Sequence, residues 1–77
     1  MNQLNILSLF VEDFNNSIND ENLRPIMFNH LTRIAELING HLSEELYEFF
    51  KHNRKKPIDL KELLPLLSPF KENETAQ

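Results

Sequence analysis

Cysteine is absent from this sequence, and glycine occurs only once. Without cysteine, the chain has no disulfide bonds, no thiolate metal ligands and no cysteine nucleophile. A single glycine cannot form the glycine-rich loop that holds phosphate groups in nucleotide-binding proteins. The four serines lack the glycine context of a nucleophile elbow. We therefore expect the chain not to be an enzyme, and we expect no cofactor, no metal ion and no small-molecule substrate.

Long apolar runs are also missing. No stretch approaches the ~20 apolar residues that a membrane-spanning helix needs. The N-terminus shows no basic region followed by an apolar block, so we predict a cytoplasmic protein. A chain of 77 residues, 40% of them hydrophobic, is long enough for one core and too short for two. We expect a single helical domain over residues 1–70 and a disordered polar tail over residues 71–77.

The distribution of proline and glycine favours an all-α fold, because these residues stand where helices are expected to begin or end. Apolar residues recur at spacings of three and four in the N-terminal segment and predict a helix over residues 3 to 18. A second helix should have Pro25 in its first turn and end near Asn39, with Gly40 directly after it. These two helices should pack as an antiparallel hairpin.

A third helix is predicted to follow Ser43, whose side-chain oxygen can accept hydrogen bonds from the first turn. Leu42 and Tyr47 have the spacing of a hydrophobic staple around this N-cap. We assign Tyr47, Phe49 and Phe50 to the core, which leaves no aromatic ring free to stack on a ligand.

The last predicted helix begins at Leu60, because Asp59 and Glu62 have the spacing of a capping box. Pro65 should interrupt this short helix, since proline lacks a backbone donor and disfavours helical geometry in the residue before it. The expected architecture is an all-α bundle of three to four helices.

Leucine is concentrated near the C-terminus, with five leucines among residues 60–67. Segments 60–64 and 63–67 both match the LxxLL pattern of helices that dock in apolar grooves, although core packing produces the same pattern. Leu9 projects away from the apolar stripe of the first helix. A domain this small often gains stability from a second copy, so we predict a homodimer. The residues assigned to the partner or dimer interface are Leu9, Leu60, Leu63, Leu64, Leu66 and Leu67.

Charge is distributed unevenly. Twelve acidic residues outnumber eight basic ones, which gives a net charge of −4 that repels a phosphate backbone. Four of the basic residues nevertheless lie close together in the short segment 51–56. These cations, which are candidates for contact with phosphate or with an acidic partner, are Lys51, Arg54, Lys55 and Lys56. The alternative is a solvated helix end whose charges complement the helix dipole.

A helix-turn-helix is the strongest specific alternative, because Ala35, Gly40 and Leu46 stand near the positions of its small residue, turn glycine and packing aliphatic residue. The glycine and the aliphatic residue are each displaced by one position. Glu44 and Glu45 would also point carboxylates at the DNA from the start of the recognition helix.

Three hypotheses about function follow. The leading one is a non-catalytic protein–protein interaction module, homodimeric, that regulates or inhibits another protein by covering part of its surface. The second is a small DNA-binding transcriptional regulator that uses the helix-turn-helix-like unit and the basic cluster. The third is a structural subunit of a larger assembly.

Overall fold

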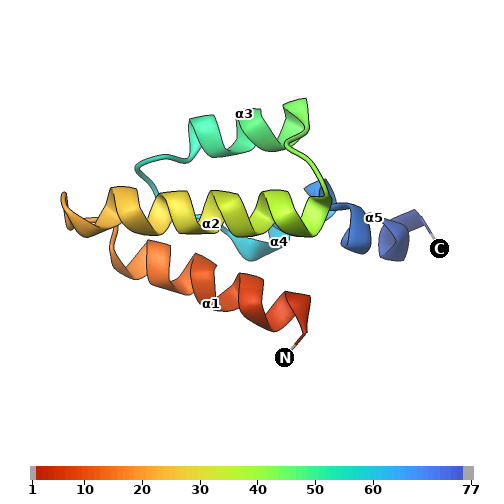
Figure 1. Ribbon diagram of the computed structural model, residues 1–77, viewed down its shortest axis with the longest axis horizontal. Helices are drawn as coiled ribbons and strands as arrows, with labels where there is room; N and C mark the ends of the chain where they lie inside the picture. The colour runs from red at the N-terminus through yellow and green to blue at the C-terminus, as the bar shows by residue number, and fades with distance from the viewer. Residues whose placement is uncertain (1, 76–77) are drawn as a thin grey trace.

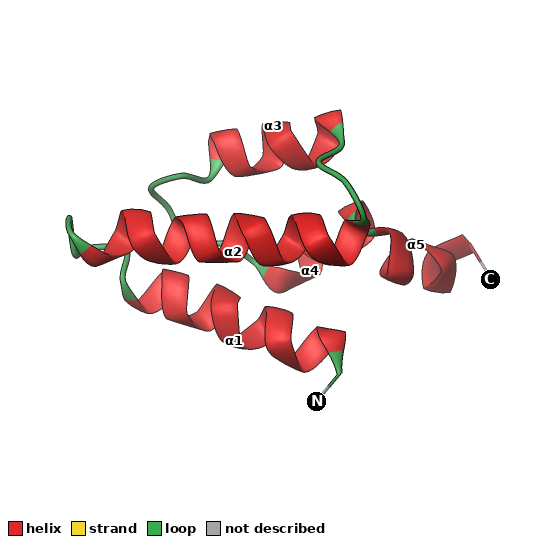
Figure 2. Cartoon of the chain, viewed as in Figure 1, coloured by secondary structure: helices red, strands yellow, loops and turns green. Residues whose placement is uncertain are grey.

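The structure is a computed structural model that describes the backbone of residues 2–75 and the side chains of residues 2–71. Every regular element in this range is helical, which confirms the all-α prediction (Figure 2). The elements in chain order are α1 (Gln3–Asn16), α2 (Leu23–Asn39), α3 (Glu44–His52), α4 (Leu60–Leu63), the 3₁₀ helix η1 (Leu64–Leu66) and α5 (Ser68–Thr75).

Helices α1 and α2 form the predicted antiparallel hairpin (Figure 1). The side chain of Asn2 begins α1 by accepting a hydrogen bond from the backbone N–H of Asn5 at 2.8 Å. In the connection, Asp20 Oδ1 accepts hydrogen bonds from the N–H groups of Asn22 at 3.0 Å and Leu23 at 2.9 Å. Asp20 therefore satisfies donors at the start of α2 that have no partner within the helix.

The C-terminal end of α2 matches the sequence prediction. Gly40 has a φ of 94°, and its N–H donates to the carbonyl of Glu36 at 2.9 Å. This left-handed geometry costs side-chain-bearing residues free energy and is the common use of glycine after a helix. The chain consequently turns sharply and brings α3 back along α2.

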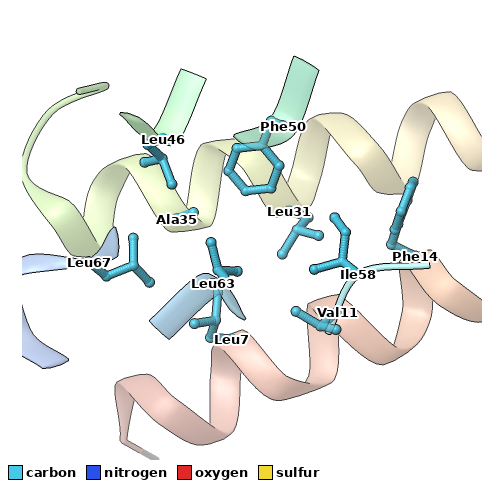
Figure 3. Packing of buried hydrophobic residues seen from close by; sticks show 10 residues of the cluster. All are labelled: Leu7, Val11, Phe14, Leu31, Ala35, Leu46, Phe50, Ile58, Leu63 and Leu67. Carbon is cyan, nitrogen blue, oxygen red and sulfur yellow. The ribbon is translucent and has the colours of Figure 1, made fainter. Parts of the chain in front are cut away.

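Helix α3 begins as predicted, because Ser43 Oγ accepts a hydrogen bond from the N–H of Leu46 at 3.1 Å. Leu46 and Phe50 are buried and point from α3 toward α2 (Figure 3). The third helix thus covers the face of α2 that lies away from α1 (Figure 1).

The C-terminal third is divided into short helices. Asp59 Oδ1 accepts a hydrogen bond from the N–H of Lys61 at 2.9 Å and begins α4. Pro65 lies inside η1, so the predicted interruption appears as a change from α to 3₁₀ geometry. We predicted a polar tail from residue 71, whereas α5 continues to Thr75. Pro69 suits the first turn of this additional helix, and residues 76–77 of the predicted tail lie outside the described residues.

A single apolar core joins these elements (Figure 3). Its buried members come from α1, α2, α3, α4 and the loop positions beside α4 and η1. They are Leu7, Val11, Phe14, Leu31, Ala35, Leu46, Phe50, Ile58, Leu63 and Leu67.

Two asparagine side chains attach the C-terminal segments to the hairpin. Asn15 Nδ2 donates to the carbonyl of Ile58 at 2.9 Å, and Asn15 Oδ1 accepts from the Ile58 N–H at 2.8 Å. Asn39 Oδ1 accepts from the N–H of Ser68 at 2.7 Å and from its hydroxyl at 2.9 Å. Three of these bonds satisfy backbone groups that have no partner within a helix: both groups of Ile58 and the N–H of Ser68 at the start of α5.

We expect Asn15→Ala to lower the free energy of unfolding by about 1–3 kcal/mol, because it leaves the two backbone groups of buried Ile58 without their partner. The measurement is urea denaturation followed by circular dichroism. Asn16→Ala is the matched control, since Asn16 is the exposed neighbour on α1. Equal losses in the two variants would show that the Asn15 bonds contribute nothing specific.

Candidate protein-binding surface

The structure separates the leucines that were assigned to an interface. Leu63 and Leu67 are fully buried at 0% exposure, so the prediction that they contact a partner is wrong. Both point into the core because the α4–η1 segment folds beneath the α1–α2 hairpin and α3 (Figure 3). The other C-terminal leucines, Leu60, Leu64 and Leu66, are half-buried against the same core. Leu9 lies exposed on α1, at 48%.

Large exposed apolar side chains gather instead on one side of α2. Leu37 is the most exposed of these, at 68%, because its neighbours Ile34 and Ile38 take the positions against the core. At about 100° per residue, positions spaced alternately by three and four share one side of a helix. We call this exposed side the α2 outer stripe; it contains three aliphatic side chains, Leu23, Ile26 and Leu37, with His30 and Arg33 between them.

Four phenylalanine rings form a chain of contacts that crosses the three long helices. The ring of Phe28 on α2 lies 5.6 Å from that of Phe14 on α1 and 5.9 Å from that of Phe50 on α3, between centroids. Phe50 in turn contacts Phe49 at 5.5 Å, close to edge-to-face. Helix α3 therefore meets α2 through large side chains, and its backbone stays further away than that of α1.

This spacing leaves a surface groove between α2 and α3. A pocket of about 230 Å³ opens there, and most of its lining is apolar. We call it the anchor pocket; its lining residues are Phe28, Thr32, Leu42, Tyr47, Phe50, Lys51 and Arg54. A second pocket of about 200 Å³ adjoins it through Phe28 and Arg54 and is completed by Arg24, Pro25, Asn29 and Lys55. Together the two pockets form the α2–α3 groove.

The groove collects positive charge in a chain whose net charge is −4. Three members of the predicted basic cluster line it: Lys51 and Arg54 in the anchor pocket, Arg54 and Lys55 in the second pocket. Among the described side chains, no carboxylate lines either pocket. Lys56 is exposed but lines neither of them. The structure therefore places most of the basic cluster beside an apolar cavity that sequence reasoning did not find.

Tyr47 was assigned to the core, and this assignment is wrong. Its side chain is 52% exposed and forms part of the anchor pocket, together with Leu42. Leu46 and Phe50 form the buried side of α3 that faces α2. Tyr47 lies at the edge of this side and is therefore only partly covered. The four-residue spacing of Tyr47 and Lys51 places them on one side of α3, and this pairing of an aromatic with a basic residue was the available signal in the sequence.

The carboxylates of α3 are not among the residues that line the two pockets, and two of them have polar partners outside the groove. Glu48 Oε1 is 3.6 Å from His52 Nε2 on the helix surface. Glu45 Oε1 is 3.5 Å from Lys71 Nζ at the start of α5. Glu45 and Glu48 thus lie near side chains that do not belong to the groove.

Other site chemistries find no support in the described part of the chain. Over that range, no three His, Asp or Glu side chains are grouped so that they could hold a metal ion. None of the described helices combines the length and apolar character needed to cross a membrane. Comparisons with protein-family models, with curated proteins and with solved structures find no match to this chain.

We expect Phe50→Leu to lower the free energy of unfolding by about 1–3 kcal/mol, because it removes two aromatic contacts worth about 0.5–1.5 kcal/mol each beyond area burial. Tyr47→Leu, on the same helix but half-exposed, should change stability by less than about 0.5 kcal/mol. Urea denaturation of both variants measures the difference. If the two losses are the same, the aromatic chain does not hold α3 in place.

Proposed function

We propose that this chain is a non-catalytic protein–protein interaction module that regulates another protein by covering part of its surface. The α2–α3 groove is the contact surface. The observation that carries the proposal is an open apolar pocket with a cationic rim, Lys51 and Arg54, on an otherwise acidic protein. Such a combination of an apolar centre and a charged rim is the usual anatomy of a protein interface.

The size of the anchor pocket favours a protein partner over a metabolite. Pockets that enclose a small-molecule ligand usually measure about 300–1,000 Å³, whereas this one measures about 230 Å³. A cavity of this size is suited to one anchor side chain, and buried anchor residues supply much of the binding energy in protein interfaces. The groove therefore fits a segment of polypeptide better than a free cofactor.

DNA binding is the competing function, and the exposed ring of Tyr47 beside Lys51 and Arg54 is the observation that favours it. Against it, the first turn of α3 carries Glu44 and Glu45, both exposed. In a helix-turn-helix, the N-terminal residues of the second helix contact base edges. Two carboxylates at that position repel the phosphates on either side of the major groove.

Self-association forms the second part of the proposal. With Leu63 and Leu67 buried, the α2 outer stripe replaces the C-terminal leucines as the surface for a second copy. It also replaces Leu9, which lies on α1 outside both the stripe and the groove. Its 3–4 spacing is that of a helix seam that packs against another helix, and its ends are aliphatic, with Leu23 and Leu37. Covering Leu37 and Ile26 removes the largest exposed apolar side chains of α2 from water.

We expect Leu37→Glu to convert a dimer into a monomer in light scattering, because it places a charge at the most exposed apolar position of the proposed seam. Leu9→Glu is the control: it makes the same chemical change at an exposed leucine of α1 that lies outside the stripe. A wild-type chain that is monomeric at every concentration tested contradicts the homodimer, and equal disruption by the two variants contradicts its location.

Affinity capture from native cell extract with mass spectrometry tests the protein-binding function. Proteins retained by the wild type should also be retained by Leu9→Glu and should be lost with Leu42→Glu, because only the latter places a carboxylate in the anchor pocket. The two leucines are matched in exposure, 47% for Leu42 and 48% for Leu9. Retention of the same proteins by both variants would place the contact surface elsewhere.

A further inference from the structure

We propose that the α2–α3 groove binds a short acidic segment of its partner, most readily a helix, that inserts one large apolar side chain into the anchor pocket and places carboxylates beside Lys51 and Arg54. This inference rests on the proposed function and names the chemistry of the partner. The groove determines that chemistry through three features: an apolar cavity, cations without carboxylate partners, and acidic surroundings that exclude longer polyanions.

The cavity accepts an apolar group. Phe28 and Phe50 form part of its wall from the aromatic chain, and Leu42 and Tyr47 add half-exposed apolar surface. Thr32 contributes the hydroxyl of the lining, but that hydroxyl already donates to the carbonyl of Asn29 at 3.0 Å. An aromatic or large aliphatic side chain in this space leaves water and contacts the rings. Burial of its apolar surface contributes favourable binding free energy.

The rim cations are available for a partner. Among the described side chains, the ion pairs involve His52 with Glu48 and Lys71 with Glu45. Within the same range, no carboxylate lies within ion-pair distance of Lys51, Arg54 or Lys55. Carboxylates of a bound segment therefore meet cations that need not release an internal partner, and the apolar cavity beside them lowers the local dielectric and strengthens the attraction.

Arg54 lines both pockets, so a bound segment that contacts Arg54 can occupy both of them. The second pocket adds Arg24 and Lys55, and none of its described lining residues is a carboxylate. A helix places residues three and four apart on one face. A helix with acidic residues three or four positions to each side of one apolar residue can therefore place the apolar side chain in the anchor pocket and carboxylates beside the cations of both pockets.

The surroundings favour a short acidic segment over nucleic acid. Glu44, Glu45 and Glu48 are all exposed on α3, the helix that forms one wall of the groove. A phosphate backbone carries its charges at regular short intervals, so a duplex laid along α3 meets these carboxylates. A peptide can place its carboxylates at a few positions only and so contacts the cations without meeting α3's own acids.

The test is a titration of ¹⁵N-labelled full-length chain with synthetic peptides of about 15 residues, a length that allows a helix to form. The first peptide carries one phenylalanine flanked by glutamates at three- and four-residue spacing. The second replaces each glutamate with lysine, and the third replaces the phenylalanine with alanine. A short duplex DNA is titrated in parallel, because it competes for the same cations.

We expect the glutamate–phenylalanine peptide to shift the amide resonances of Tyr47, Lys51 and Arg54. The lysine peptide should not bind, and the alanine peptide should bind about tenfold more weakly, since it lacks the anchor. The shifts should shrink as salt is added, because exposed ion pairs are screened.

Matched variants locate the binding site. Leu42→Ala should weaken the peptide severalfold, whereas Leu9→Ala, at nearly equal exposure, should leave it unchanged. Arg54→Glu should weaken it by about fivefold or more. Lys61→Glu makes the same change in net charge at an exposed position on α4, outside both pockets, and should have little effect. Each variant is first checked for a wild-type amide spectrum outside its own vicinity.

The inference is overturned if the lysine peptide binds as well as the glutamate peptide, if duplex DNA alone produces the shifts, or if no peptide binds. These failures are distinct from failure of the proposed function. The capture experiment with Leu42→Glu and Leu9→Glu still reports whether the groove binds a protein of other chemistry. If Leu42→Glu retains the same proteins as Leu9→Glu, the proposed function of the groove is contradicted, independently of the peptide results.

Discussion

Phe28 contacts an aromatic ring on each neighbouring helix, and the spacing of α1, α2 and α3 depends on those two contacts. The Phe14 ring lies on one side, in the last turn of α1, and the Phe50 ring lies on the other. Aromatic side chains are large and stiff, so the distance between α2 and α3 is set by ring dimensions. Helices this short have little stability of their own and take it from such packing.

The same rings produce the groove. Because Phe28 and Phe50 hold α3 away from α2, the space above the rings is left open to solvent and becomes the anchor pocket. The core and the binding surface therefore share side chains. The loops on either side of α3 are fixed independently, through Asn39 at the end of α2 and through Asn15, which binds both backbone groups of Ile58. The position of α3 beside the pocket is consequently fixed by the ring contact and by the loops at both of its ends.

Local signals were sufficient to predict much of this fold. Gly40, Ser43 and Pro65 act at short range, through backbone geometry and capping, and each marks the boundary or interruption that was expected. The candidate site was less accessible from sequence, because burial of a side chain depends on which helix lies opposite. Tyr47 was assigned to the core, but the neighbouring helices cover only part of the apolar side of α3, so its side chain is 52% exposed. Conversely, the five leucines of residues 60–67 led us to expect leucines on the surface. In the structure, the chain turns through η1, and Leu63 and Leu67 on either side of it are buried in the core.

The central claim is that the anchor pocket, which Phe28 and Phe50 help to line, receives the anchor side chain of an acidic partner segment. Intermolecular nuclear Overhauser effects in the complex with the glutamate–phenylalanine peptide test it most directly. The account predicts effects between the peptide phenylalanine and ring protons of Phe28, Tyr47 and Phe50. Effects between that phenylalanine and Leu37 or Ile26 instead, on the α2 outer stripe, would contradict it.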